Sequence, residues 1–150
     1  MNISRRLTAG AAVLATTAAL AAFSAPQAGA ATAAATYNGE CGSGYTVVNS
    51  APIGSQGTVF LTYKSANGYN CVVTKKNNTS TRTDMFAYLY VPESGEGNSD
   101  WGSYYSYAGP VYAYGKGMCI DWGGGITNQE TWTFGSNCGS LKEHRVTKGW

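Results

Sequence analysis

Short runs rich in Val, Thr, Tyr, Phe and Trp follow one another through most of the chain, separated by clusters of Gly, Pro, Asn and Ser. Such regularly spaced runs between turn signals are typical of the strands of a β-sandwich or barrel. None of these runs shows the 3.6-residue period of an amphipathic helix. The runs occupy residues 45–49, 58–63, 69–75, 85–91, 103–107, 111–114, 118–122 and 131–134. The sequence therefore predicts an all-β domain, a small β-sandwich or barrel of about seven to eight short antiparallel strands.

The first thirty residues differ in composition from the rest and have the pattern of a secretory leader. Arg5 and Arg6 form a positive start, residues 7–22 are small or apolar without a charge, and an Ala-Gly-Ala cleavage pattern ends at Ala30. The apolar stretch is shorter than the ~20 strongly apolar residues that span a bilayer. We expect a mature protein outside the cell, without membrane insertion after cleavage. The predicted divisions are a signal peptide over 1–30, a flexible tail over 31–36, a single all-β domain over 37–140 and a C-terminal tail over 141–150.

Removal of the leader makes the mature part formally neutral. The chain has ten Lys and Arg against eight Asp and Glu, and the leader removes two of the arginines and none of the acids. A nucleic-acid partner or an anionic membrane surface requires clustered Lys and Arg. The composition favours neither, and no nucleic acid is expected among the partners.

Four cysteines, all beyond the leader, predict a disulfide framework in an exported chain. Cys41, Cys71, Cys119 and Cys138 allow three connectivities. We favour the pairing of Cys41 with Cys71 and of Cys119 with Cys138, because each pair brackets one compact run of predicted strands. Each bridge should contribute about 3 to 4 kcal/mol in the chain-entropy model. A structural zinc site needs closely spaced cysteine pairs, which the sequence lacks, so no metal is expected.

Alternation along residues 85–91 predicts which side chains face the core. One side is aliphatic, with Met85, Ala87, Leu89 and Val91, and the other is aromatic, with Phe86, Tyr88 and Tyr90. We expect the aliphatic side in the core. The aromatic side either packs against a second surface or faces water.

Several glycine-containing segments are expected to be turns or loops. Residues 66–68 predict a hairpin turn, because their Asn-Gly pair accepts positive φ. Residues 108–110 are expected to reverse the chain between two Tyr-rich strands, and residues 93–100 to form a polar loop. Residues 123–125 are three glycines, expected as a flexible loop that leaves Trp122 at its rim.

The residues offer no catalytic constellation, so neither an enzyme nor a cofactor is expected. A Ser, His, Asp triad needs a histidine held in a cleft, and the single histidine, His144, lies in the C-terminal tail. Asp121 stands in an apolar run, where it is either a structural anchor for the glycine loop, the interpretation we favour, or half of an acid pair. The oxygens of residues 93–100 do not follow the spacing of an EF-hand, and a solvated loop is the better interpretation.

Aromatic residues are abundant, with eleven Tyr and four Trp in the chain. Five of the tyrosines fall within residues 104–114, so both faces of one predicted hairpin would bear rings. Such rings either fill the core of a domain poor in aliphatic residues or form an exposed face that stacks on sugars. The candidate binding face comprises Trp101, Tyr105, Tyr112 and Trp122.

Four longer segments are specific enough to compare with known families. They are CGSGYTVVNS from Cys41, PIGSQGTVFLTYKSANGYNCVVT from Pro52, YAGPVYAYGKGMCIDWGG from Tyr107 and NCG from Asn137. Together they resemble the spore-associated protein A family of sporulating actinobacteria over nearly the whole mature domain, with the same four-cysteine frame. The resemblance implies an exported protein found with spores or in the medium, without established enzymatic activity or catalytic residues. The tail over 141–150 departs from it, because such chains are expected to stop soon after the last Cys-Gly.

The leading hypothesis is a secreted, non-enzymatic protein associated with the spore or cell surface, with a spore or cell-wall polysaccharide as its expected partner. A carbohydrate- or cell-wall-binding module that uses a Tyr- and Trp-rich face is the first alternative. A secreted protease inhibitor that presents a disulfide-braced loop is the second.

Overall fold

The computed structural model of the protein describes residues 34–139. The predicted signal peptide over 1–30, the first half of the tail predicted over 31–36, and the C-terminal tail over 141–150 with His144 lie outside the described residues. Within the described part, no helix is long and apolar enough to cross a membrane.

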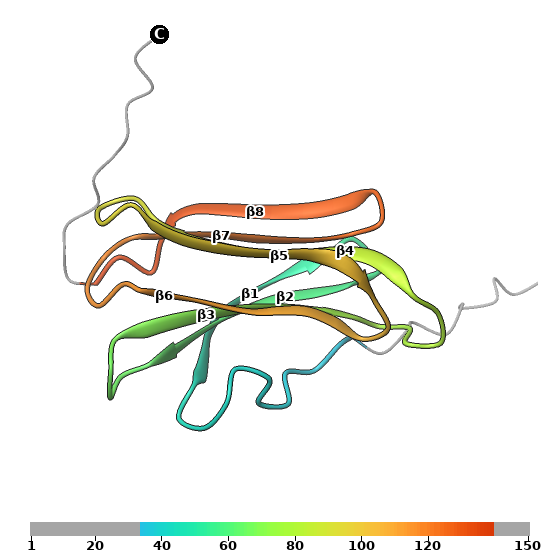
Figure 1. Cartoon of the computed structure of the whole chain (residues 1–150), viewed down its shortest axis with the longest axis horizontal. Helices are drawn as coiled ribbons and strands as arrows, with labels where there is room; N and C mark the ends of the chain where they lie inside the picture. The colour runs from blue at the N-terminus through green and yellow to red at the C-terminus, as the bar shows by residue number, and fades with distance from the viewer. Residues whose placement is uncertain (1–33, 140–150) are drawn as a thin grey trace, which may run out of the picture. The chain divides into compact units, whose positions relative to one another are not determined.

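Eight strands form two antiparallel sheets that pack face to face (Figure 1). The first sheet has the order β1-β2-β3-β6 and the second the order β5-β4-β7-β8. The strands are β1 (Thr46–Ile53), β2 (Gly57–Lys64), β3 (Tyr69–Lys76), β4 (Thr83–Val91), β5 (Glu96–Tyr104), β6 (Tyr107–Tyr114), β7 (Ile120–Ile126) and β8 (Gln129–Ser136). The predicted all-β sandwich is confirmed.

The core between the two sheets is mostly aliphatic. Val59, Leu61 and Val72 of the first sheet are fully buried in it. The second sheet contributes the aliphatic side of β4, as the alternation predicts, with Met85, Ala87, Leu89 and Val91. Because successive side chains of a strand point to opposite faces, the aromatic side of β4 lies on the outside of the second sheet.

The glycine run 123–125 is part of the central strand β7, so the predicted flexible loop is wrong. A Cβ atom on Gly124 would lie 2.0 Å from the Oγ1 of Thr74, so the missing side chain lets the two sheets approach each other here. Trp122, predicted at the rim of a loop, is a core residue with 1% of its surface exposed. Its indole N–H donates to the Ser136 hydroxyl at 2.8 Å, which satisfies the polar edge of the buried ring.

The Tyr-rich hairpin predicted around residues 104–114 does not form. Strand β5 ends at Tyr104 and β6 begins at Tyr107, but the two strands belong to different sheets. The chain does not reverse at residues 108–110, because β6 continues through Pro110 beside a register shift in its ladder with β3. Proline is accepted there because β6 is an edge strand and a bulge does not require the missing N–H.

The polar segment 93–100 is only partly a loop. Residues 92–95 turn the chain, and β5 then begins at Glu96 as an edge strand of the second sheet. Asp100 accepts hydrogen bonds from the Tyr104 hydroxyl at 2.6 Å and from the Gly109 N–H of β6 at 2.7 Å. The bond to Asp100 also raises the pKa of the Tyr104 hydroxyl. This carboxylate therefore links the edges of the two sheets.

The disulfides join Cys41 to Cys71 and Cys119 to Cys138, which confirms the favoured pairing. The first ties the segment before β1 to β3, and the second ties the residue before β7 to the segment after β8. All four cysteines of the chain are thus paired.

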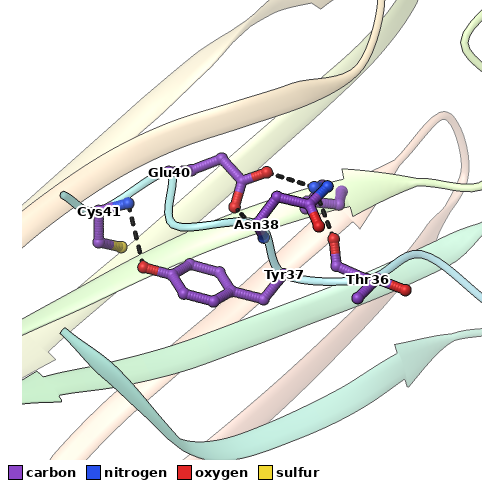
Figure 2. A network of polar contacts seen from close by, with 6 residues as sticks. Thr36, Tyr37, Asn38, Glu40 and Cys41 are labelled. Atoms are coloured by element: carbon purple, nitrogen blue, oxygen red, sulfur yellow. Dashed lines mark hydrogen bonds and ion pairs between the residues drawn. The ribbon is translucent and has the colours of Figure 1, made fainter. Parts of the chain in front are cut away.

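Residues 34–45, here called the N-terminal strap, lie over the outer face of the first sheet (Figure 2). Tyr37 and Tyr45 of the strap pack on a buried cluster that contains Phe60, Val73 and the Cys41–Cys71 disulfide. The strap therefore gives the first sheet a second apolar layer on the side opposite the main core.

An ion pair fixes the strap to β3. The Lys75 ammonium group contacts the Glu40 carboxylate and donates to the Thr36 carbonyl at 2.6 Å (Figure 2). The second oxygen of Glu40 accepts from the Asn38 N–H at 2.9 Å. Burial raises the pKa of Glu40, but the bonds from Lys75 and the backbone outweigh it and leave the pKa below its ordinary value. Thr36, in the second half of the predicted tail, is therefore held against the sheet.

Candidate functional site

Five aromatic side chains form a continuous band on the outer face of the second sheet. This aromatic band comprises Phe86 and Tyr88 of β4, Trp101 of β5, and Trp132 and Phe134 of β8. Residues of β4 that alternate with the core face outward, and cross-strand partners share a face. Because β5 and β8 are the edge strands, the band reaches from one edge of the sheet to the other.

The strand register places the band in rows that cross the sheet. One row contains Trp101, Phe86, Gly125 and Glu130, from β5, β4, β7 and β8 in that order. In the neighbouring row, Gly123 pairs with Trp132. The central strand β7 therefore contributes only glycine to both rows.

The two outward-facing glycines of β7 leave room for the rings of neighbouring strands. A Cβ atom on Gly125 would lie 2.1 Å from the Phe86 ring, and one on Gly123 would lie 2.6 Å from the Trp132 ring. Both rings thus lie over the glycine backbone, a close approach that a side chain would prevent. The glycine run is the floor of the aromatic band.

Contacts between the rings make the band rigid. Phe86 stacks on Trp101 with ring centroids 4.1 Å apart and 16° between the planes. Trp132 lies 5.3 Å from both Phe86 and Tyr88, and 6.3 Å from the parallel ring of Phe134. Trp101 is 62% exposed and Phe134 68% exposed, whereas Phe86 is buried. The exposed rings at the two edges are therefore apolar platforms supported by the rings between them.

An open hollow of about 460 Å³ lies beside Trp101 at one end of the band. Trp101 and Phe86 line it together with the acidic residues Asp84 and Glu130. The other lining residues are Met85, Gly102, Ser103, Gly125 and Thr127. Asp84 precedes Phe86 by two positions and Glu130 lies in the same row as Trp101, so both carboxylates are on the outer face. Aromatic and carboxylate groups in one hollow fit a ligand that has both apolar and hydrogen-bonding surfaces.

The four residues of the predicted binding face are not brought together. Trp101 belongs to the aromatic band, and Tyr105 lies in the turn between β5 and β6, 56% exposed. Tyr112 lies on the first sheet, where its hydroxyl donates to a carbonyl of the N-terminal strap at 3.1 Å. Trp122 is buried in the core, because the glycine loop that would have exposed it is a strand.

Sequence reasoning missed Trp132 and Phe134, and it did not assign a role to the aromatic side of β4. The spacing of Trp132 and Phe134 alone places both rings on one face of a strand. Joining them to Phe86 requires the strand order β4-β7-β8, which no local pattern reveals.

Asp121 is bound to the backbone of the neighbouring strand. Its Oδ1 accepts a hydrogen bond from the Gly135 N–H of β8 at 2.7 Å, so its partner is not the glycine run that was expected. Among residues 34–139, no group of three or more His, Cys, Asp or Glu is arranged to hold a metal ion.

A smaller hollow of about 270 Å³ adjoins Lys76 at the end of β3. The Lys76 ammonium group contacts the Thr81 carbonyl and the Thr83 hydroxyl, the latter at 2.7 Å, and only 6% of the residue is exposed. Burial lowers the pKa of this amine. These bonds hold the segment between β3 and β4. The hollow beside the aromatic band is the larger of the two, so the band is the candidate surface that we consider further.

The chain is similar to a curated protein, spore-associated protein A of Streptomyces coelicolor. The two sequences are 59% identical over 128 residues, which cover 84% of this chain and 83% of the relative. No protein-family model matches the chain. No solved structure matches it either. An identity this high over most of both chains shows that the chain belongs to the spore-associated protein A family.

Proposed function

We propose that the mature chain is a secreted, non-enzymatic protein that attaches to the spore or hyphal surface through the aromatic band. The leader pattern over 1–30 and the two disulfides support export. The name of the Streptomyces coelicolor relative supports an association with spores. A non-enzymatic role is supported by the paired cysteines and by the binding of Asp100 and Asp121 to backbone N–H groups.

The aromatic band is the observation on which attachment rests. Large apolar side chains gathered on one face of a small protein usually mark a contact with another molecule. Trp101 and Phe134 are more than half exposed, although ring stacking holds them on a regular sheet. A rigid exposed surface loses little conformational entropy when it binds, which favours a role in attachment.

Export is tested by expressing the full chain in a sporulating actinobacterial host and sequencing the N-terminus of the protein in the medium. We expect a mature chain that begins at Ala31. Protein that stays in the cells with an intact leader would contradict export.

Attachment is tested by mixing the secreted protein with spores and measuring its partition between the spores and the supernatant. We expect retention at physiological salt, and a loss of at least about tenfold in the double variant Trp101→Ala/Phe134→Ala, because hot-spot aromatic residues dominate binding energies. Tyr69→Ala removes a ring that is 38% exposed on the first sheet and serves as the control, with unchanged retention. Equal retention of both variants would show that the band is not the attachment surface.

A further inference from the structure

The charged residues of the strands are divided between the two sheets by sign. The strands of the first sheet contain three lysines, Lys64, Lys75 and Lys76, and no acidic residue. The strands of the second sheet contain five acidic residues and no Lys, Arg or His; the acids are Asp84, Glu96, Asp100, Asp121 and Glu130. The sheet that bears the aromatic band is therefore the acidic one.

Three of the five acids on the second sheet are used by the fold. Glu96 accepts a hydrogen bond from the Tyr114 N–H at 3.1 Å, and Asp100 and Asp121 accept bonds from backbone N–H groups at 2.7 Å. The carboxylates of Asp84 and Glu130 have no hydrogen bond or ion pair to any side chain or backbone group of residues 34–139. These two exposed acids are the ones that line the hollow beside Trp101.

We propose that the hollow and the aromatic band bind a polysaccharide built from amino sugars with free amino groups. This proposal rests on the proposed function. The apolar face of one sugar unit stacks on the exposed ring of Trp101, because the ring offers a large apolar face. The protonated amines of that unit and of the next unit pair with Asp84 and Glu130, and hydrogen bonds between ammonium and carboxylate groups are stronger than neutral ones. The following units extend along the band toward Phe134.

The charge of the surface selects this occupant over other glycans. A polymer with carboxylate or phosphate groups would bring like charges beside Asp84 and Glu130, which opposes binding. A neutral or N-acetylated polymer would remove water from both carboxylates without supplying a counter-charge, and that desolvation is costly. A cationic amino sugar satisfies the two carboxylates and also attracts the aromatic face, because aromatic rings favour cations.

The proposal is tested by titrating the purified secreted protein with three hexasaccharides and following tryptophan fluorescence. The ligands are a glucosamine hexamer, an N-acetylglucosamine hexamer and a cellohexaose of the same length. We expect the glucosamine hexamer to bind at least about tenfold more tightly than the other two, and its affinity to fall as salt rises.

The variant Asp84→Asn/Glu130→Gln separates this proposal from the function on which it rests. It should lose at least about tenfold in affinity for the glucosamine hexamer while its circular dichroism spectrum stays unchanged. The control Glu93→Gln makes the same kind of charge change in the β4–β5 turn and keeps an oxygen for its bond from the Cys119 N–H, so its affinity should not change.

Equal or weaker binding of the glucosamine hexamer, or unchanged affinity in the carboxamide variant, would overturn the amino-sugar assignment. If the spores still retained the protein through Trp101 and Phe134, attachment by the band would stand without it. Loss of spore retention in the control Tyr69→Ala as well as in Trp101→Ala/Phe134→Ala would instead overturn the proposed attachment through the band.

Discussion

At the scale of single residues, the ion pair between Lys75 and Glu40 is the polar contact on which the N-terminal strap most depends. The two side chains are 11% and 10% exposed. Lys75→Met leaves the Glu40 carboxylate without its partner in a poorly hydrated place, so we expect the free energy of unfolding to fall by about 3 kcal/mol. Lys116 is exposed and provides the control, because Lys116→Met should change the free energy of unfolding by less than about 0.5 kcal/mol. Urea denaturation measures both variants, and similar losses would contradict the role of the pair.

The same pair makes stability depend on acid. The folded-state pKa of Glu40 lies below its ordinary value of 4.5, so folding favours the ionised form. This contribution is complete above the unfolded-state pKa and is lost as the pH falls through the folded-state pKa. We expect the free energy of unfolding to drop as the pH falls below about 4.5 and through the folded-state pKa, and to drop less in Glu40→Gln. An identical drop in both proteins would assign the acid sensitivity to other carboxyl groups.

At the scale of elements, β7 depends on glycine because its neighbours occupy both of its faces. In Gly124→Ala the new Cβ would lie 2.0 Å from the Thr74 Oγ1 and 3.0 Å from Val59. We expect this overpacking to lower the free energy of unfolding by about 1 to 3 kcal/mol. The Thr74 hydroxyl has no hydrogen-bond partner within residues 34–139, so Thr74→Ala removes the obstacle at little polar cost. Chemical denaturation of the double variant should therefore show partial recovery, and strictly additive losses would contradict a steric cause.

The elements that the sequence predicts correctly are those whose signal is local. The alternation of β4 identifies its core side, and the Asn-Gly pair marks the turn before β3, where Gly68 has a φ of 78°. The same local logic mistakes the glycines of β7 for a loop and Pro110 for a chain reversal. The conformation of those residues is determined by neighbouring strands: the glycines of β7 lie beneath aromatic rings, and Pro110 lies beside the register shift between β3 and β6. A local sequence pattern does not predict which strands will be neighbours.

The candidate site divides in the same way. Trp101 is a candidate from the sequence because aromatic rings on a sheet can stack on sugars, and the structure places it, exposed, in the aromatic band. The rest of the band and the hollow depend on which strands are neighbours, because Phe86 and Glu130 meet Trp101 only through the order β5-β4-β7-β8. Strands β4 and β7 are neighbours although β5 and β6 lie between them in the chain, so local periodicity does not reveal such a surface.

At the scale of the whole molecule, the two outer faces of the sandwich differ in what packs on them. The N-terminal strap packs on part of the outer face of the first sheet, over the cluster that contains Phe60 and Val73. The second sheet has no such cover among residues 34–139 and presents the aromatic band and its two unpaired carboxylates. Stability and attachment should therefore be separable, because they depend on opposite sides of one core.

The double variant Cys41→Ser/Cys71→Ser tests that separation. Its bridge spans 30 residues, and the bridge removed in the comparison variant Cys119→Ser/Cys138→Ser spans 19. Chain entropy alone predicts that the free energy of unfolding falls by about 3.6 and about 3.2 kcal/mol, respectively. Release of the strap also exposes the cluster around Phe60, which should make the first loss clearly the larger and should increase binding of an apolar dye. Below its melting temperature this variant should still be retained by spores, since the band lies on the other sheet. Loss of retention in the folded variant would show that the strap side of the molecule also contributes to attachment.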